Sequence, residues 1–335
     1  MRTYNEIMSA SSYSDLFSSD ENEAKKEFHS YCKVYHPDVD NSEKALKAFE
    51  KIRQLYSLRT CSTTVNSSVH EEVIFRDIRT NKGFSLNNPV ILNVCPGGIK
   101  IYHTATKVAL IFEKEYSKLY ENYIKQVDNL SYKDDKMEKE FKRYFPKVLK
   151  HFELADSNGK HCILLEKTSE VLNLGKIVTS YKARGEKFPK EQAAWIMNRL
   201  FNLSCYFEFM GKAFNGFSLE NIWVSPEMHT VLLLDGFEYA KELNEKMLGC
   251  PVSVFKTLPI KIKDNKLSST LTDLESIKSI SRELFAGHDD LVNIQKYIKA
   301  GTDSNSTFDE WDAYGKAVYA DFGKREFIVW ENVPY

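Results

Sequence analysis

Polar side chains of reactive types stand close together at two places in the sequence. His36, Pro37 and Asp38 are consecutive, so an imidazole, a rigid ring and a carboxylate share one short corner of the chain. Asn221 stands directly before one short apolar run, and Asp235 directly after the next. The six cysteines are far apart and form no C-x-x-C pair, which argues against a disulfide framework and a zinc site. We therefore expect free thiols in a reducing compartment. Any chemistry is expected to depend on residues 36–38 and on the pair Asn221 and Asp235.

Two amphipathic segments must position the corner at residues 36–38. In each of them, apolar side chains recur three and four residues apart, a spacing that places them on one stripe of an α-helix. The stripes consist of Ala24, Phe28, Tyr31 and Tyr35 in the first segment, and of Ala45, Phe49, Ile52 and Tyr56 in the second. Because only a few residues join the segments, both stripes can be buried only if the helices fold back as an antiparallel pair. The short segment at residues 13–17 is expected to lie against them.

The corner itself is predicted to be stiff and exposed to solvent. Pro37 has no amide proton and disfavours helical dihedral angles at His36, so the first helix must end near Tyr35. The second helix then needs a new start. Asp40 and Glu43 supply a capping acceptor and an acidic side chain in the first turn, where both stabilise a helix.

The outward face of the first helix is predicted to be basic, since Lys26, His29 and Lys33 fall opposite the apolar stripe. The order of these elements resembles a J-domain, the module by which DnaJ-type co-chaperones stimulate the ATPase of DnaK-type heat-shock chaperones. The residues that carry the resemblance are a helix reading EAKKEFHSYCKVY, then HPD, then a helix reading SEKALKAFEKIRQLY. It covers about residues 11–58.

The resemblance implies a surface that binds a DnaK-type chaperone. The residues that it assigns to this surface are His36, Pro37 and Asp38 at the corner, and Lys25, Lys26, His29 and Lys33 on the basic face. The family usually carries more Lys and Arg before the corner, where this sequence has His29 and Ser30, so we expect weaker or more selective docking. In one interpretation, protonation of His29 below pH ~6.5 strengthens docking, and in the other His29 is simply a solvated surface histidine. The alternative is a DNA-binding or purely structural hairpin that contains the tripeptide by chance.

The sequence divides into two regions. Residues 59–72 are rich in Ser and Thr and poor in apolar side chains, which is typical of a flexible connector. Beyond them, short β-branched runs predict strands, and apolar residues three and four apart between Lys190 and Met210 predict a long buried helix. The predicted boundaries are residues 1–60 for the J-domain, 61–72 for the linker and 73–335 for a second domain, with a small β-rich lobe at about 73–172 and a larger helical lobe at about 173–335.

The second region resembles a protein kinase. A small sheet, a long helix, a loop ending in Glu220-Asn221, a hairpin and Asp235-Gly236 follow in the kinase order, and Thr272-Asp273-Leu274 resembles the start of the next large helix. In kinases the loop asparagine and the strand-end aspartate hold magnesium on the nucleotide phosphates. The expected fold is therefore multidomain, with an all-α J-domain helical hairpin followed by an α+β bilobal protein-kinase-like domain.

Several catalytic groups of a kinase are expected to be missing. The strand motif matches Val108-Ala109-Leu110-Ile111, with Ile111 in place of the phosphate-binding lysine. This replacement leaves Glu138 or Glu140 on the following helix without its usual ionic partner. Gly216 stands in place of the aspartate that accepts the substrate proton. The degenerate kinase positions are Ile111, Glu140, Gly216, Asn221 and Asp235.

Some alternatives stay open at this stage. The phosphate loop is reduced to Pro96-Gly97-Gly98, and Lys107 or Lys114 is able to reach phosphates if the strand register differs by a residue or more. Asn221 and Asp235 either retain residual Mg-ATP binding or serve only to cap turns and hold backbone amides. We expect no catalytic residue, no resident metal and no tightly bound cofactor.

Composition excludes other classes of function. Lys and Arg number 46 against 47 Asp and Glu, for a net charge of −1, which gives no general attraction to nucleic acid or anionic lipid. The longest apolar runs are far shorter than the ~20 residues needed to cross a bilayer. The first ten residues lack the apolar segment of a secretory signal, so a cytoplasmic location is expected.

Together these observations predict a co-chaperone that binds a DnaK-type chaperone and stimulates its ATPase, with an inactive pseudokinase as a platform for targeting or binding. The sequence does not indicate which client or target protein the platform binds. One alternative is an atypical active kinase that the J-domain tethers to chaperones. Another is a mimic that sequesters the chaperone of a host.

Overall fold

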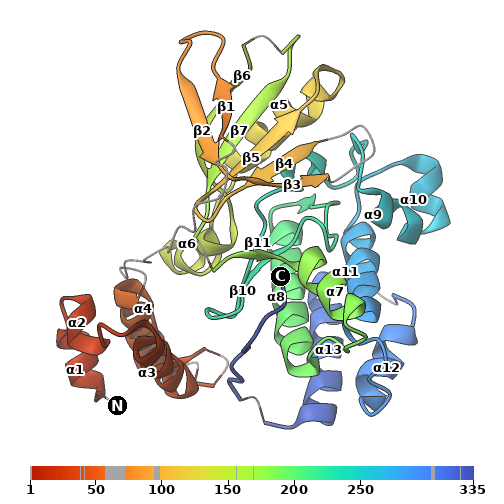
Figure 1. Cartoon of the computed structure of the whole chain (residues 1–335). Helices are drawn as coiled ribbons and strands as arrows, with labels where there is room; N and C mark the ends of the chain where they lie inside the picture. Colours follow the sequence, from red (N-terminus) through yellow and green to blue (C-terminus); the bar gives the residue numbers. More distant parts are fainter. Residues whose placement is uncertain are drawn as a thin grey trace. The chain divides into compact units, whose positions relative to one another are not determined.

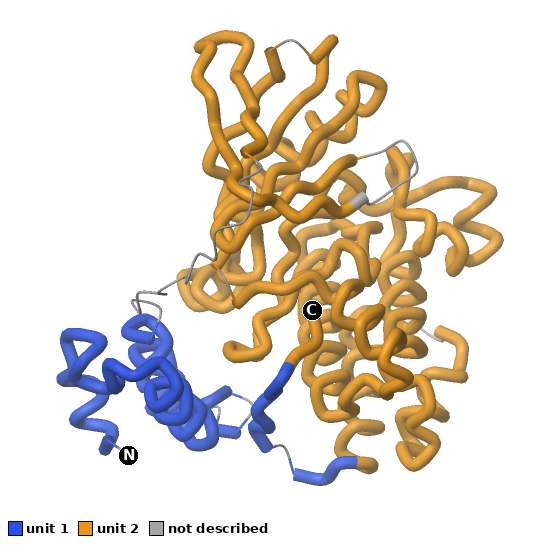
Figure 2. Tube along the Cα trace, viewed as in Figure 1, with its two compact units in different colours: residues 1–68, 322–332 blue, residues 69–321, 333–335 orange. Residues whose placement is uncertain are grey.

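The computed structural model describes residues 2–37, 39–40, 42–56, 72–93, 99–155, 157–168, 170–302, 306–324 and 326–335. Asp38, the Pro96–Gly98 turn and all of the predicted linker except Glu72 lie outside these residues. The chain divides into two compact units, which Figure 2 shows in separate colours. Unit 1 consists of Met1–Ser68 and Phe322–Asn332, and unit 2 consists of Val69–Asp321 and Val333–Tyr335. Residues 322–332, which the sequence assigned to the second domain, therefore belong to the first unit.

Unit 1 begins with four helices. These are α1 (Tyr4–Ser9), α2 (Tyr13–Leu16), α3 (Glu21–Tyr35) and α4 (Glu43–Tyr56). The Asp20 carboxylate caps α3 by accepting a hydrogen bond from the Glu23 amide at 2.9 Å. Ser42, and not Asp40, caps α4, because its hydroxyl accepts from the Ala45 amide at 3.2 Å. Asp40 instead accepts from the amide of Ser42 at 2.8 Å and so holds the turn before the helix.

Helices α3 and α4 lie side by side (Figure 1), and aromatic contacts join them. The rings of Phe28 and Tyr56 are stacked with their centroids 4.1 Å apart. Phe17, directly after α2, contacts Tyr31 and Tyr56 at centroid distances of 5.9 Å and 5.1 Å. Since Phe28 has no exposed surface and Tyr31 and Tyr56 have almost none, the two predicted stripes face each other, and the segment at residues 13–17 closes one side of this small core.

The first part of unit 2 is a sheet with five antiparallel strands in the order β3-β4-β5-β7-β6. Its strands are β3 (Val90–Asn93), β4 (Lys100–His103), β5 (Lys107–Phe112), β6 (Lys147–Glu153) and β7 (His161–Glu166). A separate hairpin of β1 (Glu72–Arg76) and β2 (Gly83–Asn87) packs on one face, where Ala109 and Ile111 of β5 lie in its apolar cluster. The other face carries α5 (Ser117–Asp128), since Phe112 contacts Tyr123 there at a centroid distance of 6.5 Å.

The second part of unit 2 is mostly helical. Its long central helix, α8 (Lys190–Phe209), confirms the helix predicted from Lys190 onward. It begins after Pro189, and Gly211 takes a φ of +68° just beyond its end. The remaining α-helices are α6 (Asp135–Phe141), α7 (Leu174–Ala183), α9 (Val252–Thr257), α10 (Ile260–Asn265), α11 (Thr270–Leu284), α12 (Val292–Lys299) and α13 (Thr307–Phe322). The 3-10 helices are η1 (Lys114–Tyr116), η2 (Lys142–Tyr144) and η3 (Phe237–Tyr239).

Short strands connect these helices. They are β8 (Leu172–Asn173), β9 (Lys212–Ala213), β10 (Trp223–Ser225), β11 (Thr230–Leu232) and β12 (Lys241–Glu242). The predicted hairpin is the antiparallel pair β10 and β11, and α11 packs beside α8 (Figure 1). Unit 2 is therefore a mixed α+β structure in which a small sheet, a long helix and a short hairpin follow one another in the order that the sequence predicts. In the part of the chain that the structure describes, no helix has both the length and the apolar character to cross a membrane.

The Phe28→Ala variant tests the small core of unit 1. Removal of a fully buried phenylalanine typically costs about 3–5 kcal/mol, so amide exchange should accelerate throughout residues 21–56 while unit 2 is unaffected. Hydrogen exchange followed by mass spectrometry measures both units in the full chain. The matched control is Val34→Ala on the same helix, where the side chain is 39% exposed. Equal protection of α3 and α4 in wild type and Phe28→Ala would contradict this packing.

Candidate functional site

A buried carboxylate holds the loop between α8 and β10 in place. Asp273, in α11, accepts hydrogen bonds from the backbone amides of Phe214 and Asn215, both at 2.7 Å. Its side chain is 1% exposed, and this burial raises the pKa of Asp273 to about 7. The side chain of Asn215 donates in turn to the Tyr239 carbonyl at 3.1 Å. These hydrogen bonds therefore hold the backbone of the loop that contains Gly216 and Asn221 in one conformation.

Gly216, which the sequence analysis expected in place of a catalytic aspartate, lies where a side chain does not fit. A Cβ atom at this position would lie 2.9 Å from the carbonyl oxygen of Gly236 and 3.1 Å from Cε1 of Phe214. Gly236 itself has a φ of +96°, and a Cβ there would lie 2.6 Å from Cζ of Phe214. Backbone and ring atoms thus fill the space that a proton-accepting carboxylate would need, and one substitution at Gly216 cannot restore it.

Asn221 and Asp235 are brought to the same place, but both are enclosed. The Trp223 indole N–H donates to Oδ1 of Asp235 at 3.0 Å, and the Asn221 amide donates to the Gly216 carbonyl at 3.2 Å. Asn221 has no exposed surface and Asp235 is 1% exposed. Among the described residues, Oδ2 of Asp235 and Oδ1 of Asn221 have no hydrogen-bond partner. Burial raises the pKa of Asp235 to about 7, so the protein favours the neutral carboxyl far more than water does.

These residues do not fit a magnesium–nucleotide complex. The two unpaired oxygens belong to the classes that magnesium binds, but this ion also keeps water ligands and contacts phosphates, which need open space. Asn221 and Asp235 are closed off from solvent, and a carboxyl group whose pKa is raised by burial is a weaker ligand at neutral pH. Within the described residues, no group of three or more His, Cys, Asp or Glu side chains is arranged to hold a metal ion.

Ile111 does not face the helix that covers the sheet. It lies with Ala109 in the apolar cluster under the β1–β2 hairpin, whereas Phe112 faces α5. Because side chains alternate along a strand, Leu110 shares the face of Phe112. The prediction that Ile111 takes the lysine position is therefore wrong by one residue, because the short apolar run gave no sign of which face was which. Whether the expected lysine position falls at residue 110 or at residue 111, the side chain there is apolar.

One of two glutamates, Glu138 or Glu140, was expected to lack the strand lysine as its usual ionic partner, and both pair instead with residues that follow them closely in the chain. Both lie in α6, where Glu138 pairs with Lys142 at 2.8 Å and Glu140 pairs with Arg143 at 2.6 Å. The prediction for Glu140 is wrong because α5, and not α6, packs against the segment that follows Asp235.

The side chains that α5 presents to this segment are polar but uncharged. Asn122 donates to the Glu238 and Ala240 carbonyls, both at 2.9 Å, and Tyr123 donates to the Leu234 carbonyl at 2.6 Å. Sequence reasoning missed both residues. The signal was available, since Asn122 and Tyr123 are adjacent polar residues on a helix directly after the buried strand.

Three lysines near the sheet bear on phosphate binding. Lys107 begins β5, and the aliphatic chain of Lys114 lies against Gly159 in the turn before β7. Lys167 was not singled out from the sequence, yet it is only 6% exposed and donates to the carbonyls of Val171 and Thr168 at 2.9 Å and 3.2 Å. Burial lowers the pKa of Lys167 to about 8. Its ammonium group stabilises the connection between the sheet and α7.

The last residue of the chain lies where the sheet meets the helical part of unit 2. The Tyr335 hydroxyl lies 3.4 Å from Nε2 of His103 and accepts a hydrogen bond from the Asn173 amide at 3.4 Å. His103 contacts Trp223 at a centroid distance of 5.3 Å. Burial lowers the pKa of His103 to about 4, so this imidazole is neutral at pH 7. A continuous series of contacts thus runs from Asp235 through Trp223 and His103 to Tyr335.

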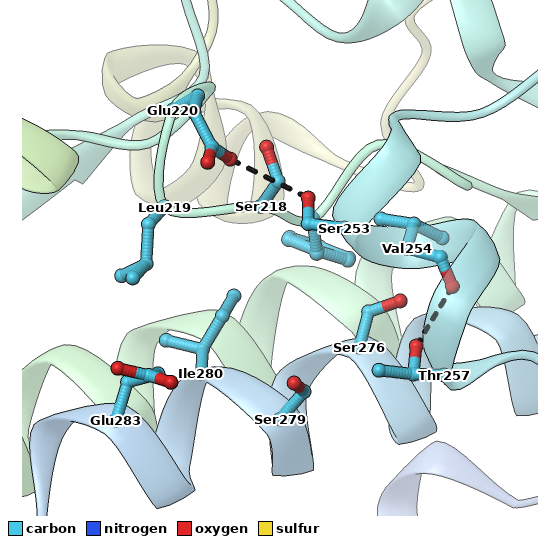
Figure 3. A pocket seen from close by; sticks show the side chains of 11 residues that line it. Ser218, Leu219, Glu220, Ser253, Val254, Thr257, Ser276, Ser279, Ile280 and Glu283 are labelled. Carbon is cyan, nitrogen blue, oxygen red and sulfur yellow. Dashed lines mark hydrogen bonds between the residues drawn. The ribbon is translucent and has the colours of Figure 1, made fainter.

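A cavity lies beside the loop and not at Asp235. Its volume is about 190 Å³, and it opens between residues 217–220, α9 and α11 (Figure 3). Hydroxyl groups dominate its polar lining, and the Ser253 hydroxyl donates to Glu220 at 3.4 Å. Glu283 also lines it but is already paired with Lys182. The groups that the lining offers to a ligand are therefore mainly hydroxyls and carboxylates that form hydrogen bonds.

The corner at residue 36 differs most from its prediction. His36 is only 1% exposed, and two aromatic rings contact its imidazole. The ring centroids of Phe49 and Phe327 are each 4.8 Å from that of His36. Pro37 is half-buried. The prediction of an exposed His36 is wrong, because a segment almost 300 residues away in the sequence covers it.

The basic face of α3 is only partly as predicted. Lys33 and Lys26 are exposed, and Lys26 pairs with Glu23 at 2.7 Å. Lys25 and His29 are half-buried. Burial, with the positive charge of Lys25 as the next cause, lowers the pKa of His29 to about 4. The prediction that His29 gains a proton near pH 6.5 is therefore wrong, and this side chain adds no positive charge at neutral pH.

Comparison with known proteins finds a similarity in structure and none in sequence. No protein-family model matches the chain, and no curated protein matches it in sequence. Among solved structures, the chain is similar to the crystal structure of the BubR1 kinase domain, with a TM-score of 0.49 and 10% sequence identity. The similarity covers 76% of this chain and 84% of that one.

The enclosure of Asp235 predicts a dependence of stability on pH. The pKa of Asp235 is about 7 in the folded chain but about 3.9 in an unfolded one, so the folded state binds the extra proton between these values. The free energy of unfolding therefore falls as the pH rises from about 4 to 7. Asp235→Asn keeps an acceptor for the Trp223 indole but does not titrate, so its melting temperature should fall less between pH 5 and pH 8.

Thermal unfolding monitored by circular dichroism measures this difference. Glu238 is also buried, with a pKa raised to about 8, so a smaller pH dependence remains in the variant. Asp312→Asn, which removes an exposed carboxylate, serves as the control and should follow the wild type. Identical pH profiles for wild type and Asp235→Asn would show that the carboxyl group is not enclosed in this way.

Proposed function

We propose that this chain is a DnaJ-type co-chaperone that binds a DnaK-type heat-shock chaperone and stimulates its ATPase, and that unit 2 is a pseudokinase that serves as a binding or targeting platform. The observation that carries the first part is the helix break at His36 and Pro37. It lies between two helices packed through Phe28 and Tyr56, with Lys26 and Lys33 exposed on α3. This combination supports recognition of a partner protein and offers no nucleophile.

The proposed action is differential binding. A co-chaperone raises the ATPase rate of its partner only if it binds the hydrolysis-competent conformation more tightly than the other conformation. In this proposal the corner at residues 36–38 makes the discriminating contact, and the lysines of α3 accelerate encounter with a negative surface. Long-range attraction of this kind weakens as salt is added.

The pseudokinase part rests on the surroundings of Gly216 and Asp235. Phosphoryl transfer needs a positioned hydroxyl acceptor, metal ligands and cations around the phosphates. Backbone atoms of Gly236 and the Phe214 ring fill the place of the acceptor, and Leu110 and Phe112 of β5 face α5 where the lysine would stand. A unit with these replacements supports binding of another protein better than it supports catalysis.

A second candidate, an atypical active kinase held at chaperones by unit 1, is favoured by one observation. The unpaired oxygens of Asp235 and Asn221 are the atoms that would bind magnesium. Because both residues are closed off, we predict that Mg-ATP does not change the melting temperature of the full chain. A stabilisation that disappears in Asp235→Asn would support nucleotide binding, and phosphate transfer to a protein substrate would establish the kinase.

The proposed co-chaperone activity is tested by single-turnover ATP hydrolysis with a purified DnaK-type chaperone. We expect the wild-type chain to accelerate hydrolysis, and His36→Gln and Asp38→Asn each to return the rate to that of the chaperone alone. Two variants are needed because His36 also contributes to packing. The control is Lys136→Ala, an exposed change in unit 2, which should behave as wild type.

Two outcomes would contradict the proposal. Absence of binding and of stimulation by the wild-type chain would remove unit 1 as a chaperone-binding module. Binding measured by interferometry without any acceleration of hydrolysis would instead identify a sequestering mimic, since a mimic occupies the chaperone without productive turnover.

A further inference from the structure

The segment that ends unit 1 is an extended, largely irregular stretch of the chain (Figure 2). Phe327 and Trp330 are 5% and 6% exposed, whereas Ile328 between them is 43% exposed. The two aromatic side chains are thus buried although no helix or strand holds the segment. An extended segment that buries selected aromatic residues resembles a bound peptide more than a flexible tail.

The first contact that fixes this segment is with His36. The Phe327 ring lies 4.8 Å from the imidazole, with an angle of 46° between the planes. The imidazole is already in contact with Phe49 of α4 on another side, and the two rings leave it 1% exposed. The side chain to which the proposed function gives the main recognition role is therefore covered by residues of this same chain.

A second link between the segment and α3 is electrostatic. The carboxylate of Glu331 acts to raise the pKa of His29, against burial and the charges of Lys25 and Lys33 that lower it. Residues 326–332 read EFIVWEN, with two glutamates and no lysine or arginine. Glu331 therefore brings negative charge toward the face of α3 that carries Lys33, and its charge complements that face.

We propose that residues 326–332 are an intramolecular ligand that covers the recognition surface around His36 and must leave before an external partner binds there. The kind of partner that fits this surface is an extended segment with aromatic side chains and acidic residues, as in the covering segment itself. The covering stands on the contact of Phe327 with His36 and on the charge of Glu331 near His29, while its effect on a chaperone rests on the proposed function. A partner that binds only the open form has its affinity reduced by the fraction of open molecules.

The test uses full-length chains and a readout that needs no partner. Diethyl pyrocarbonate modifies accessible imidazoles, and mass spectrometry reports the rate for each histidine. We expect Phe327→Ala to increase the rate of His36 modification at least about tenfold. If fewer than about one molecule in ten is open in the wild type, removal of the cover raises the fraction with an accessible His36 by at least that factor. Ile328→Ala, next to Phe327 but on the exposed side, is the matched control and should leave the rate unchanged.

Two measurements guard against misfolding. His103, which is 4% exposed in unit 2, should react equally slowly in all variants. Phe327→Leu keeps an apolar side chain and should restore most of the protection of His36, whereas a generally unfolded chain would not recover. Equal modification of His36 in wild type and Phe327→Ala would overturn the proposal.

A second arm separates this inference from the proposed function. If both are correct, Phe327→Ala reaches half-maximal stimulation of a DnaK-type ATPase at a concentration about tenfold lower than wild type does. If His36 becomes reactive but neither chain binds or stimulates the chaperone, the covering is upheld and the proposed function fails. If His36 becomes reactive and both chains stimulate equally, competition between the segment and the partner is excluded.

Discussion

Aromatic rings enclose the polar side chains at both candidate sites. The rings of Phe49 and Phe327 both contact the His36 imidazole at centroid distances of 4.8 Å, and Trp223 donates its indole N–H to the buried Asp235. Burial favours the neutral form of an ionisable group, so Asp235 has a pKa raised to about 7. A polar group in such surroundings is available to a partner or an ion only after the rings around it move.

In unit 2 this enclosure joins the loop, the hairpin and the sheet into one packed structure. Asp273 fixes the loop through two backbone amides, and the glycine at position 216 then allows the Gly236 backbone to approach closely. The glycine at position 216 and the tight packing around Phe214 are thus parts of one arrangement. A well-packed core at this place suits the binding platform that we propose.

Local patterns in the sequence predicted local structure well. The stripe through Phe28, the break imposed by Pro37 and the long helix from Lys190 depend on spacing and on the chemistry of single residues, and each is present. Contacts between distant segments were not predictable in the same way. Nothing in the spacing around His36 indicates a contact with Phe327. The residues of Val108–Phe112 are all apolar, so their sequence does not indicate which of them face α5. The choice of α5 over α6 beside the sheet likewise depends on packing, since both follow β5.

The most direct test places a fluorine label on the covering ring. With 4-fluorophenylalanine at position 327, the ¹⁹F resonance of the full chain should have the shift of a buried ring. On titration with a DnaK-type chaperone in its ATP state, it should move to the shift of a solvent-exposed ring in proportion to the complex formed. A chaperone that binds to saturation while the resonance stays at its buried position would contradict a recognition surface at His36 covered by this segment.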